Sequence, residues 1–215
     1  SDARLSPGGG GGVRSTMMEG MTALAMQSPD AIAELARIWR RYEGDPDGAI
    51  RAITETAATA LKVARASVWL LEDDNEKLTC VDLYEAAENR HSSGIVLLRS
   101  DFPGYFTALA EEETIAADDA HTDHRTCEFS QPYLAPLGIG AMLVAPIGTG
   151  LRLVGVLCHE HIGPARPWSA TQRFRRRPRA GILATSGPSP TQIPIRAGER
   201  CAWTPSSARV AMIQP

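Results

Sequence analysis

The stretch that decides the fold spans residues 139–161 and reads IGAMLVAPI, GTG, LRLVGVLC and HEH. Its two apolar runs, 139–147 and 151–158, flank a short connection that contains glycine, and this spacing predicts a β-hairpin. The first run is apolar on both of its alternating faces, so we expect both faces of the hairpin to be covered. A central antiparallel hairpin with a layer on each side predicts an α/β sandwich, of which one face can carry a pocket.

Two helices are expected before the first strand. Ser28-Pro29-Asp30 and Asp45-Pro46-Asp47 are both helix-start signals, because each is a capping side chain followed by proline and an acid. Apolar residues at helical spacing follow both signals, and Gly44 ends the first helix. The short link between the two predicts an antiparallel helical hairpin.

A second strand hairpin is expected between these helices and the central hairpin. Its strands are 66–72 (ASVWLLE) and 78–85 (LTCVDLYE), and strict alternation in the latter places Asp82 and Tyr84 on the same face as Cys80. The segments that follow are a strand at 94–98, a helix at 104–113, an extended piece at 114–117, a polar loop at 118–126 and a helical stretch at 127–137 interrupted by Pro132 and Pro136.

This insertion should lie over one face of an antiparallel sheet as a lid. The N- and C-terminal helices should cover the other face, the last of them beginning at Trp168 with Ser169 as its cap.

Composition and charge argue against nucleic-acid binding, membrane insertion and secretion. The net charge is −3, but residues 1–174 hold 15 Lys and Arg against 24 Asp and Glu, so the main body is acidic and a poor partner for nucleic acid. No apolar run approaches the roughly 20 residues that span a membrane, and no secretory signal peptide is recognisable. The four cysteines are widely spaced, which favours a reduced, cytoplasmic setting.

Several motifs in the expected order resemble a GAF domain of the kind found in bacterial multidomain signalling proteins. They are RASVWLLEDDNEKLTCVDLYE, NRHSSGIVLLRSDFPGYFTAL, TIAADDAHTDHRTCEFSQPYLAPLGIGAMLVAPI and LVGVLCHEHIGPARPW. The resemblance covers about residues 30–174. It implies a six-stranded antiparallel sheet between terminal helices and a lid of short helices and loops.

The resemblance also implies a ligand pocket under the lid, although GAF pockets hold cyclic nucleotides, bilins, haem, small acids or nothing known, so the ligand and any cofactor stay unidentified. Cys127 lies in the lid region, but its neighbours do not match a bilin-attachment pattern. Matched onto this sequence, the ligand-binding residues would be Tyr84, Phe102, Tyr105, Phe106, Ile115, Asp118, Asp119, Phe129, Tyr133, Met142, Val144 and Cys158.

Two polar clusters have a chemical and a structural interpretation. Cys158-His159-Glu160-His161 suggests a metal site, but alternation separates its side chains onto two faces, so we favour a strand end with a solvated histidine pair. The loop 118–126 offers carboxylates and histidines to a ligand, but we favour a capped turn in which Asp123 pairs with Arg125. The lid aromatics are either core or a stacking surface for a planar ligand.

The chain divides into three parts. We expect residues 1–27 to form a flexible Gly-rich segment, and the resemblance implies that residues 28–174 form a GAF-like sensory domain. In residues 175–215 the helical periodicity stops, and the composition is basic, with seven Arg and one acidic residue. We interpret this last part as a disordered basic tail that arises from a frameshift, the alternative being a genuine tail.

These observations predict a sensory input module without catalytic or metal-binding residues of its own. It would bind a small molecule, or relay a signal, and form a homodimer through its terminal helices. It would act on an absent output domain, a histidine kinase of a two-component system or a diguanylate cyclase. The alternatives are a free-standing enzyme of the methionine-sulfoxide reductase type, which needs reactive cysteines, and a dimerisation scaffold without ligand.

Overall fold

The computed structural model describes residues 44–111, 114–149, 152–170 and 172–173. The helix expected after Ser28, the Gly-rich start and the basic tail lie outside these residues. The elements in chain order are α3 (Pro46–Leu61), β1 (Arg65–Glu72), η1 (Asp73–Asn75), β2 (Lys77–Glu85), β3 (Arg90–Ser92), β4 (Val96–Leu98), α4 (Pro103–Glu111), β5 (Ile115–Ala117), η2 (Cys127–Phe129), η3 (Ser130–Leu134), α5 (Ala135–Leu137), β6 (Ile139–Thr149) and β7 (Arg152–Ile162).

The strands form one antiparallel sheet with the order β3-β2-β1-β7-β6-β5, and β4 also pairs with β2. The predicted central hairpin is confirmed as β6 and β7, and the second hairpin is confirmed as β1 and β2. Within the described residues the sheet has seven strands rather than six, because the short strand β3 forms where a loop is expected.

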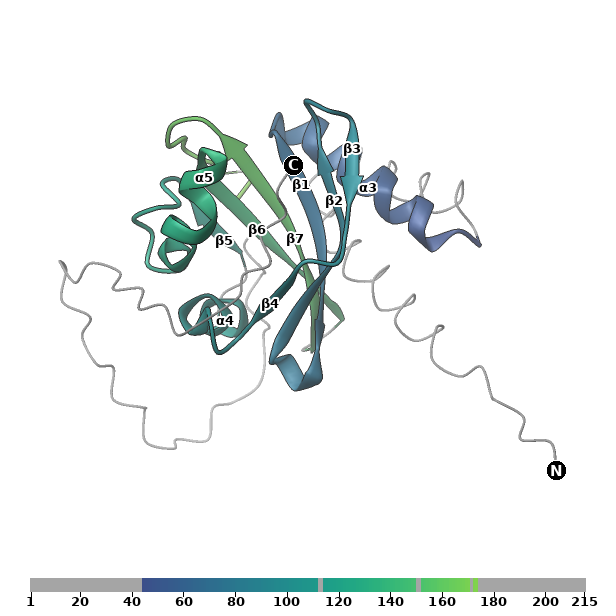
Figure 1. The fold of residues 1–215 in the computed structure, drawn as a ribbon, viewed down its shortest axis with the longest axis horizontal. Coiled ribbons are helices and arrows are strands. Elements are labelled where there is room, and N and C mark those ends of the chain that lie inside the picture. The colour runs from purple at the N-terminus through teal and green to yellow at the C-terminus, as the bar shows by residue number, and fades with distance from the viewer. Residues whose placement is uncertain (1–43, 112–113, 150–151, 171, 174–215) are drawn as a thin grey trace.

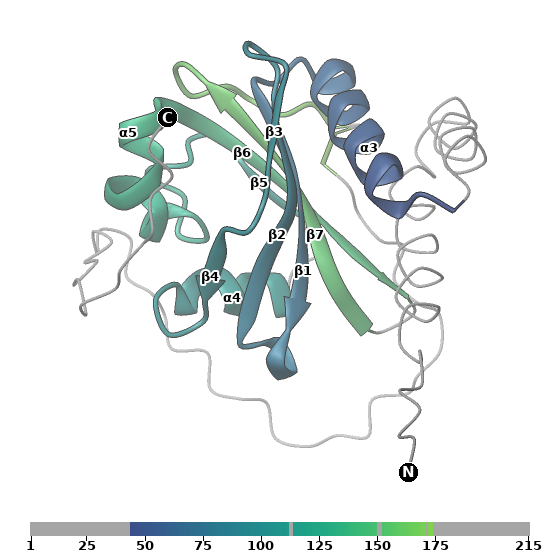
Figure 2. The ribbon, with the colours of Figure 1, turned by 45° about the vertical axis from the view of Figure 1, so that its right-hand side comes forward.

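Helices cover both faces of the sheet, as the α/β sandwich prediction requires. Figures 1 and 2 show α3 on one side of the sheet and α4 and α5 on the other. The helix α3 begins at the predicted cap, where the Asp45 side chain accepts a hydrogen bond from the backbone N–H of Gly48 at 2.9 Å. It ends at Lys62, whose backbone adopts the left-handed conformation.

A β-bulge in β2 corrects the predicted facing of its side chains. The register passes from Val68 opposite Asp82 to Trp69 opposite Cys80, so Val81 is the extra residue. Because one inserted residue reverses the alternation, Asp82 and Tyr84 point toward the α3 side, while Cys80 and Leu83 point toward the lid. The prediction that Asp82 and Tyr84 share the face of Cys80 is therefore wrong.

The lid consists of α4 and the helical run from Cys127 to Leu137. That run is confirmed as helical, and it divides into 3₁₀, π and α pieces. Pro132 and Pro136 have no N–H to donate, so a regular α-helical ladder cannot pass through them. Instead the Ala135 N–H bonds to the Ser130 carbonyl five residues back, which is the π-type pattern.

Most of the helix expected from Trp168 lies outside the described residues. Its predicted cap is present, because Ser169 Oγ accepts from the Gln172 N–H at 3.3 Å and Gln172 Oε1 accepts from the Ser169 N–H at 2.8 Å. The Arg173 N–H also bonds the Ser169 carbonyl at 3.0 Å. The reciprocal pair of Ser169 and Gln172 is a helix-start arrangement. None of the helices that the structure describes is long and apolar enough to cross a membrane.

Candidate functional site

The lid and the sheet enclose most of the residues predicted to form the pocket. Phe102 stacks on Phe129 with their ring centroids 4.4 Å apart, and Tyr105 meets Phe129 edge to face at 4.9 Å. One buried cluster unites the predicted residues Phe102, Tyr105, Phe106, Ile115, Phe129, Met142, Val144 and Cys158, with Tyr133 packed against it. Their role in ligand binding stays a prediction, since in this structure they fill the space by packing on one another.

Tyr84 lies apart from this cluster. The β2 bulge turns it to the opposite face of the sheet, where it packs beside the cluster that includes Ala58 and Leu143. Its ring lies tilted against the His91 ring, with the two ring centroids 4.9 Å apart. Its hydroxyl donates to Asn89 Oδ1 at 3.1 Å. Tyr84 therefore cannot contact a ligand held under the lid in this arrangement.

A buried carboxylate and guanidinium interrupt the apolar face beneath the lid. Glu160 of β7 lies opposite Arg65 of β1 in the strand register, and the two side chains are 2% and 5% exposed. Arg65 Nε lies 3.3 Å from Glu160 Oε2 and 3.7 Å from Glu85 Oε1. From the lid, the Tyr133 hydroxyl donates to Glu160 Oε1 at 2.8 Å, and the Arg65 guanidinium sits 5.6 Å from the centre of the Tyr133 ring.

Arg65, Glu160 and Tyr133, hereafter the polar trio, do not satisfy all of their hydrogen-bonding atoms. Arg65 Nε and Glu160 Oε2 are buried, and neither has a hydrogen-bond partner among the residues that the structure describes, although they face each other as an ion pair. Burial raises the pKa of the Glu160 carboxyl, while Arg65 and the Tyr133 hydroxyl oppose that shift. A buried charge pair with unsatisfied atoms is costly, so this group is a poor device for stability alone.

The cysteines that sequence analysis placed in strands are confirmed there. Cys80 and Cys158 are free and buried on the lid side of the sheet. Burial raises the pKa of Cys80 to about 12 and holds the pKa of Cys158 well above its ordinary value, and Glu160 adds to the latter shift. Neither thiol is therefore readily converted to the nucleophilic thiolate.

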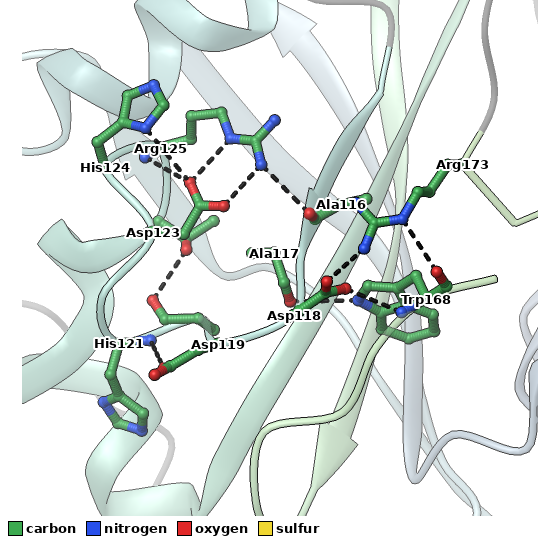
Figure 3. A network of polar contacts seen from close by, with 12 residues as sticks. Ala116, Ala117, Asp118, Asp119, His121, Asp123, His124, Arg125, Trp168 and Arg173 are labelled. Atoms are coloured by element: carbon green, nitrogen blue, oxygen red, sulfur yellow. Dashed lines mark hydrogen bonds and ion pairs between the residues drawn. The ribbon is translucent and has the colours of Figure 1, made fainter. Parts of the chain in front are cut away.

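The loop 118–126 is built as the capped turn that we favoured (Figure 3). Asp119 Oδ1 accepts from the His121 N–H at 3.0 Å, and Asp123 binds Arg125 through Oδ1 at 2.8 Å and Oδ2 at 2.6 Å. The predicted Asp123–Arg125 pair is thus confirmed. Burial opposes ionisation of Asp123, but the Arg125 bonds outweigh it and lower the pKa of that carboxyl. Arg125 also donates to the Ala116 carbonyl at 3.2 Å.

Asp118 is not directed into the lid cluster. Its Oδ1 accepts from the Trp168 N–H at 2.8 Å, and its Oδ2 pairs with Arg173, as Figure 3 shows. Asp118 and Asp119 were predicted as ligand-binding residues, and in this structure their carboxylates are occupied by contacts within the chain. A ligand could reach them only if those contacts were exchanged.

The histidines after Cys158 do not form the solvated pair that the sequence suggested. His159 is 4% exposed, and its Nδ1 donates to the Leu143 carbonyl at 3.0 Å. Burial lowers the pKa of His159 to about 4. Cys158 and Glu160 share the lid face, as alternation predicted. Within the ranges that the structure describes, no three or more His, Cys, Asp or Glu side chains are grouped to hold a metal ion.

A cleft of about 790 Å³ opens elsewhere, at the end of the sheet that carries the η1 turn. Its lining includes Leu71, Arg99 and Leu153, and it shares only Phe106 with the predicted pocket. The Arg99 guanidinium lies 5.2 Å from the centre of the Phe106 ring and bonds the Asn75 carbonyl at 3.1 Å. The polar trio of Arg65, Glu160 and Tyr133 does not line this cleft.

Sequence reasoning missed Arg65 and Glu160 as members of the site. The alternation that put Cys158 on the pocket face also put Glu160 there, and this signal was available. Arg65 offered none, because it precedes the apolar run of β1 and meets Glu160 only through the β1–β7 register.

The antiparallel sheet, its lid of short helices and the cluster enclosed between them define the GAF class of fold. The GAF domain family model matches residues 45–174, more than half of the chain. The chain therefore belongs to the GAF domain family, a class of sensory and regulatory modules. No curated protein matches it.

Solved GAF domains share this architecture. The GAF domain from an Acinetobacter phosphoenolpyruvate-protein phosphotransferase is 18% identical, with a TM-score of 0.51 over 67% of this chain and 84% of that one. The phycocyanobilin-bound GAF domain from a cyanobacterial phytochrome is 22% identical, with a TM-score of 0.51 over 64% of this chain and 82% of that one. At these identities the similarity shows the fold alone.

Proposed function

We propose that this chain is a sensory input module that binds a small molecule between its lid and its sheet. The observation that carries the proposal is the polar trio of Arg65, Glu160 and Tyr133 beneath the lid. Its members come from β1, β7 and the lid, so a compound that contacts all three would join the two layers.

The incomplete hydrogen bonding of the trio supports this reading. Arg65 Nε is a donor and Glu160 Oε2 is an acceptor, and both lack partners among the described residues. A ligand with a complementary acceptor and donor would satisfy both atoms, and the aromatic side chains around them would stack on its apolar part. A purely structural core gains more from apolar side chains at these positions than from a buried ion pair.

Ligand binding would act through a shift between two lid arrangements. The described cluster is closely packed, so entry of a ligand requires Tyr133 and its neighbours to move away from the sheet. A ligand that prefers one arrangement would then change how the flanking segments pair in a homodimer. The output, in this proposal, is a histidine kinase of a two-component system or a diguanylate cyclase in the cytoplasm.

The enzyme alternative is less well supported. A reductase of the methionine-sulfoxide type needs accessible, reactive thiols, whereas Cys80 and Cys158 are buried and have raised pKa values. No observation favours it over sensing. A scaffold with a filled core remains the competing reading, since the lid aromatics do pack on one another.

A metabolite panel screened by thermal unfolding tests the proposal against the scaffold. A ligand at about 100 times its Kd stabilises the folded chain by about 2.7 kcal/mol, which raises Tm by several degrees. Glu160→Gln should reduce or abolish that rise. Glu88→Gln is the matched control, because Glu88 is exposed and pairs with Arg90 at the surface, away from the trio. A ligand whose effect is the same in both variants would place binding away from the trio.

A further inference from the structure

The loop before the lid and the segment after β7 meet at Asp118. The Asp118 carboxylate accepts from the Trp168 N–H at 2.8 Å and pairs with Arg173, and its backbone carbonyl accepts from the Arg166 N–H at 2.9 Å. The indole Nε1 of Trp168 donates to the neighbouring Ala117 carbonyl at 3.2 Å. Residues 164–170 and 172–173, hereafter the exit segment, are therefore held by one short stretch of the chain.

The exit segment is also tied to the end of α3. Arg166 donates to the Leu61 carbonyl at 2.9 Å and to the Lys62 carbonyl at 3.1 Å, and its guanidinium lies 4.6 Å from the centre of the Trp168 ring. Trp168 is 3% exposed in the cluster on the α3 side of the sheet. The carbonyls at a helix C-terminus carry partial negative charge, so an arginine suits this position. A displacement of Trp168 would consequently disturb the end of α3 as well.

On its other side, Asp118 leads directly into the lid. The loop that follows is fixed internally, since Thr126 Oγ1 donates to the Ala120 carbonyl at 2.8 Å. It is fixed to the lid by His121 Nδ1, which bonds Ser130 Oγ at 2.8 Å. We expect a loop with these bonds to move as a unit when the lid is displaced.

We propose that Asp118 is the coupling residue through which the position of the lid sets the position of the exit segment and the end of α3. The sequence of contacts runs from Ser130 to His121, through the loop to Asp118, and from there to Trp168 and Arg173. This inference rests on the proposed sensing function, in which the coupling carries a change in lid position to the exit segment. The coupling itself is a property of the unliganded chain, so its failure and a failure of ligand binding are separately observable.

Hydrogen exchange of the 215-residue chain, followed by mass spectrometry, tests this coupling in both directions. Ser130→Ala removes the bond between lid and loop, and we expect exchange of the exit-segment amides to rise by about fivefold or more, the lower end of usual allosteric couplings. Thr107→Ala is the control, because it removes from the lid helix α4 a hydroxyl whose partner among the described residues is the Pro103 carbonyl at 2.8 Å. It should leave the exit segment unchanged.

The reciprocal variant is Asp118→Ala, which should raise exchange in residues 127–137 as well as in the exit segment, because coupling free energy acts equally in both directions. Exchange of β1 and β7 serves as the check that the whole domain has not loosened. If Asp118→Ala does not fold, Arg173→Gln removes the half-exposed partner instead. The proposal is overturned if Ser130→Ala and Thr107→Ala leave the exit segment equally protected, or if loss of the Asp118 contacts loosens the exit segment alone.

Discussion

The hydroxyl of Tyr133 donates to Glu160 Oε1 across 2.8 Å, and this bond joins the lid to the central hairpin at a buried carboxylate. The same carboxylate faces Arg65, so one side chain from the lid and two from the sheet meet at a single point. Movement of the lid away from the sheet must break this bond. Removing the Tyr133 hydroxyl should therefore shift the equilibrium from a closed toward an open lid.

Tyr133→Phe should destabilise the fold by about 1–3 kcal/mol, because the buried Glu160 Oε1 loses its hydroxyl donor and keeps the weak donor Cys158 Sγ at 4.0 Å. Urea unfolding measures the change in the free energy of unfolding. Tyr84→Phe is the matched control, since the Tyr84 hydroxyl bonds Asn89 in an exposed setting, and it should cost less than about 0.5 kcal/mol. Equal costs for the two variants would contradict the importance of the Glu160 contact.

Stability should depend on pH through His159. Its pKa is about 4 in the folded chain against an ordinary 6.5, so between these values the unfolded chain takes up a proton that the folded chain does not. Stability should therefore fall as pH drops from 6.5 to about 4, by roughly 3 kcal/mol in total, and change no further below. His159→Gln should lack this component, which chemical unfolding of both proteins at several pH values would reveal. If the unfolding free energies of the two proteins change with pH in parallel, His159 is not the source of the pH dependence.

Thr54→Val should weaken the contact between α3 and the sheet. Thr54 Oγ1 donates to the buried Asp82 carboxylate at 2.6 Å, and its loss leaves that carboxylate with His91 as its side-chain partner among the described residues. We expect a loss of about 1–3 kcal/mol in the free energy of unfolding. In Thr59→Val the same change is made at an exposed position of α3, where the partner of the hydroxyl within the described part of the chain is the Glu55 carbonyl. Both variants carry the same cost of placing valine in a helix. A similar loss of unfolding free energy in both would therefore show that the Asp82 contact is not the cause.

The β2 bulge predicts which neighbour carries more of the core. Leu83 is 2% exposed on the lid face, so Leu83→Ala should cost about 2–5 kcal/mol. Val81 is the inserted residue and is only half-buried on the α3 side, so Val81→Ala should cost about 1 kcal/mol. Unbulged pairing would place Val81 opposite Trp69, facing the lid. Unfolding measurements that rank the two costs in the reverse order would support that pairing.

The hairpins and the lid could be predicted because their signals are local. Apolar runs, turn residues and the Asp45 cap each act within a few residues, and the structure confirms them. The face of Tyr84 could not be predicted, because a bulge is a single-residue change of register that alternation does not reveal. Strand β3 was missed because it is short and polar.

The candidate site was predictable only in its apolar part. Periodicity gathers Phe102, Phe129 and Val144 into one cluster, but it cannot pair Arg65 with Glu160, whose meeting depends on which strands are neighbours. The contact between Trp168 and Asp118 could not be predicted for the same reason, because the two residues are far apart in the sequence.

Native-state thiol labelling tests the central claim most directly, because it asks whether the lid can open while the sheet stays folded. Cys80 and Cys158 lie beneath the lid, and peptide mapping reports each thiol separately. If the lid opens to admit a ligand, both thiols should react at a rate with a much weaker urea dependence than global unfolding, and Tyr133→Phe should accelerate that reaction. If both react only as fast as the whole domain unfolds, with the full urea dependence, the face beneath the lid is a filled core and the sensing account is contradicted.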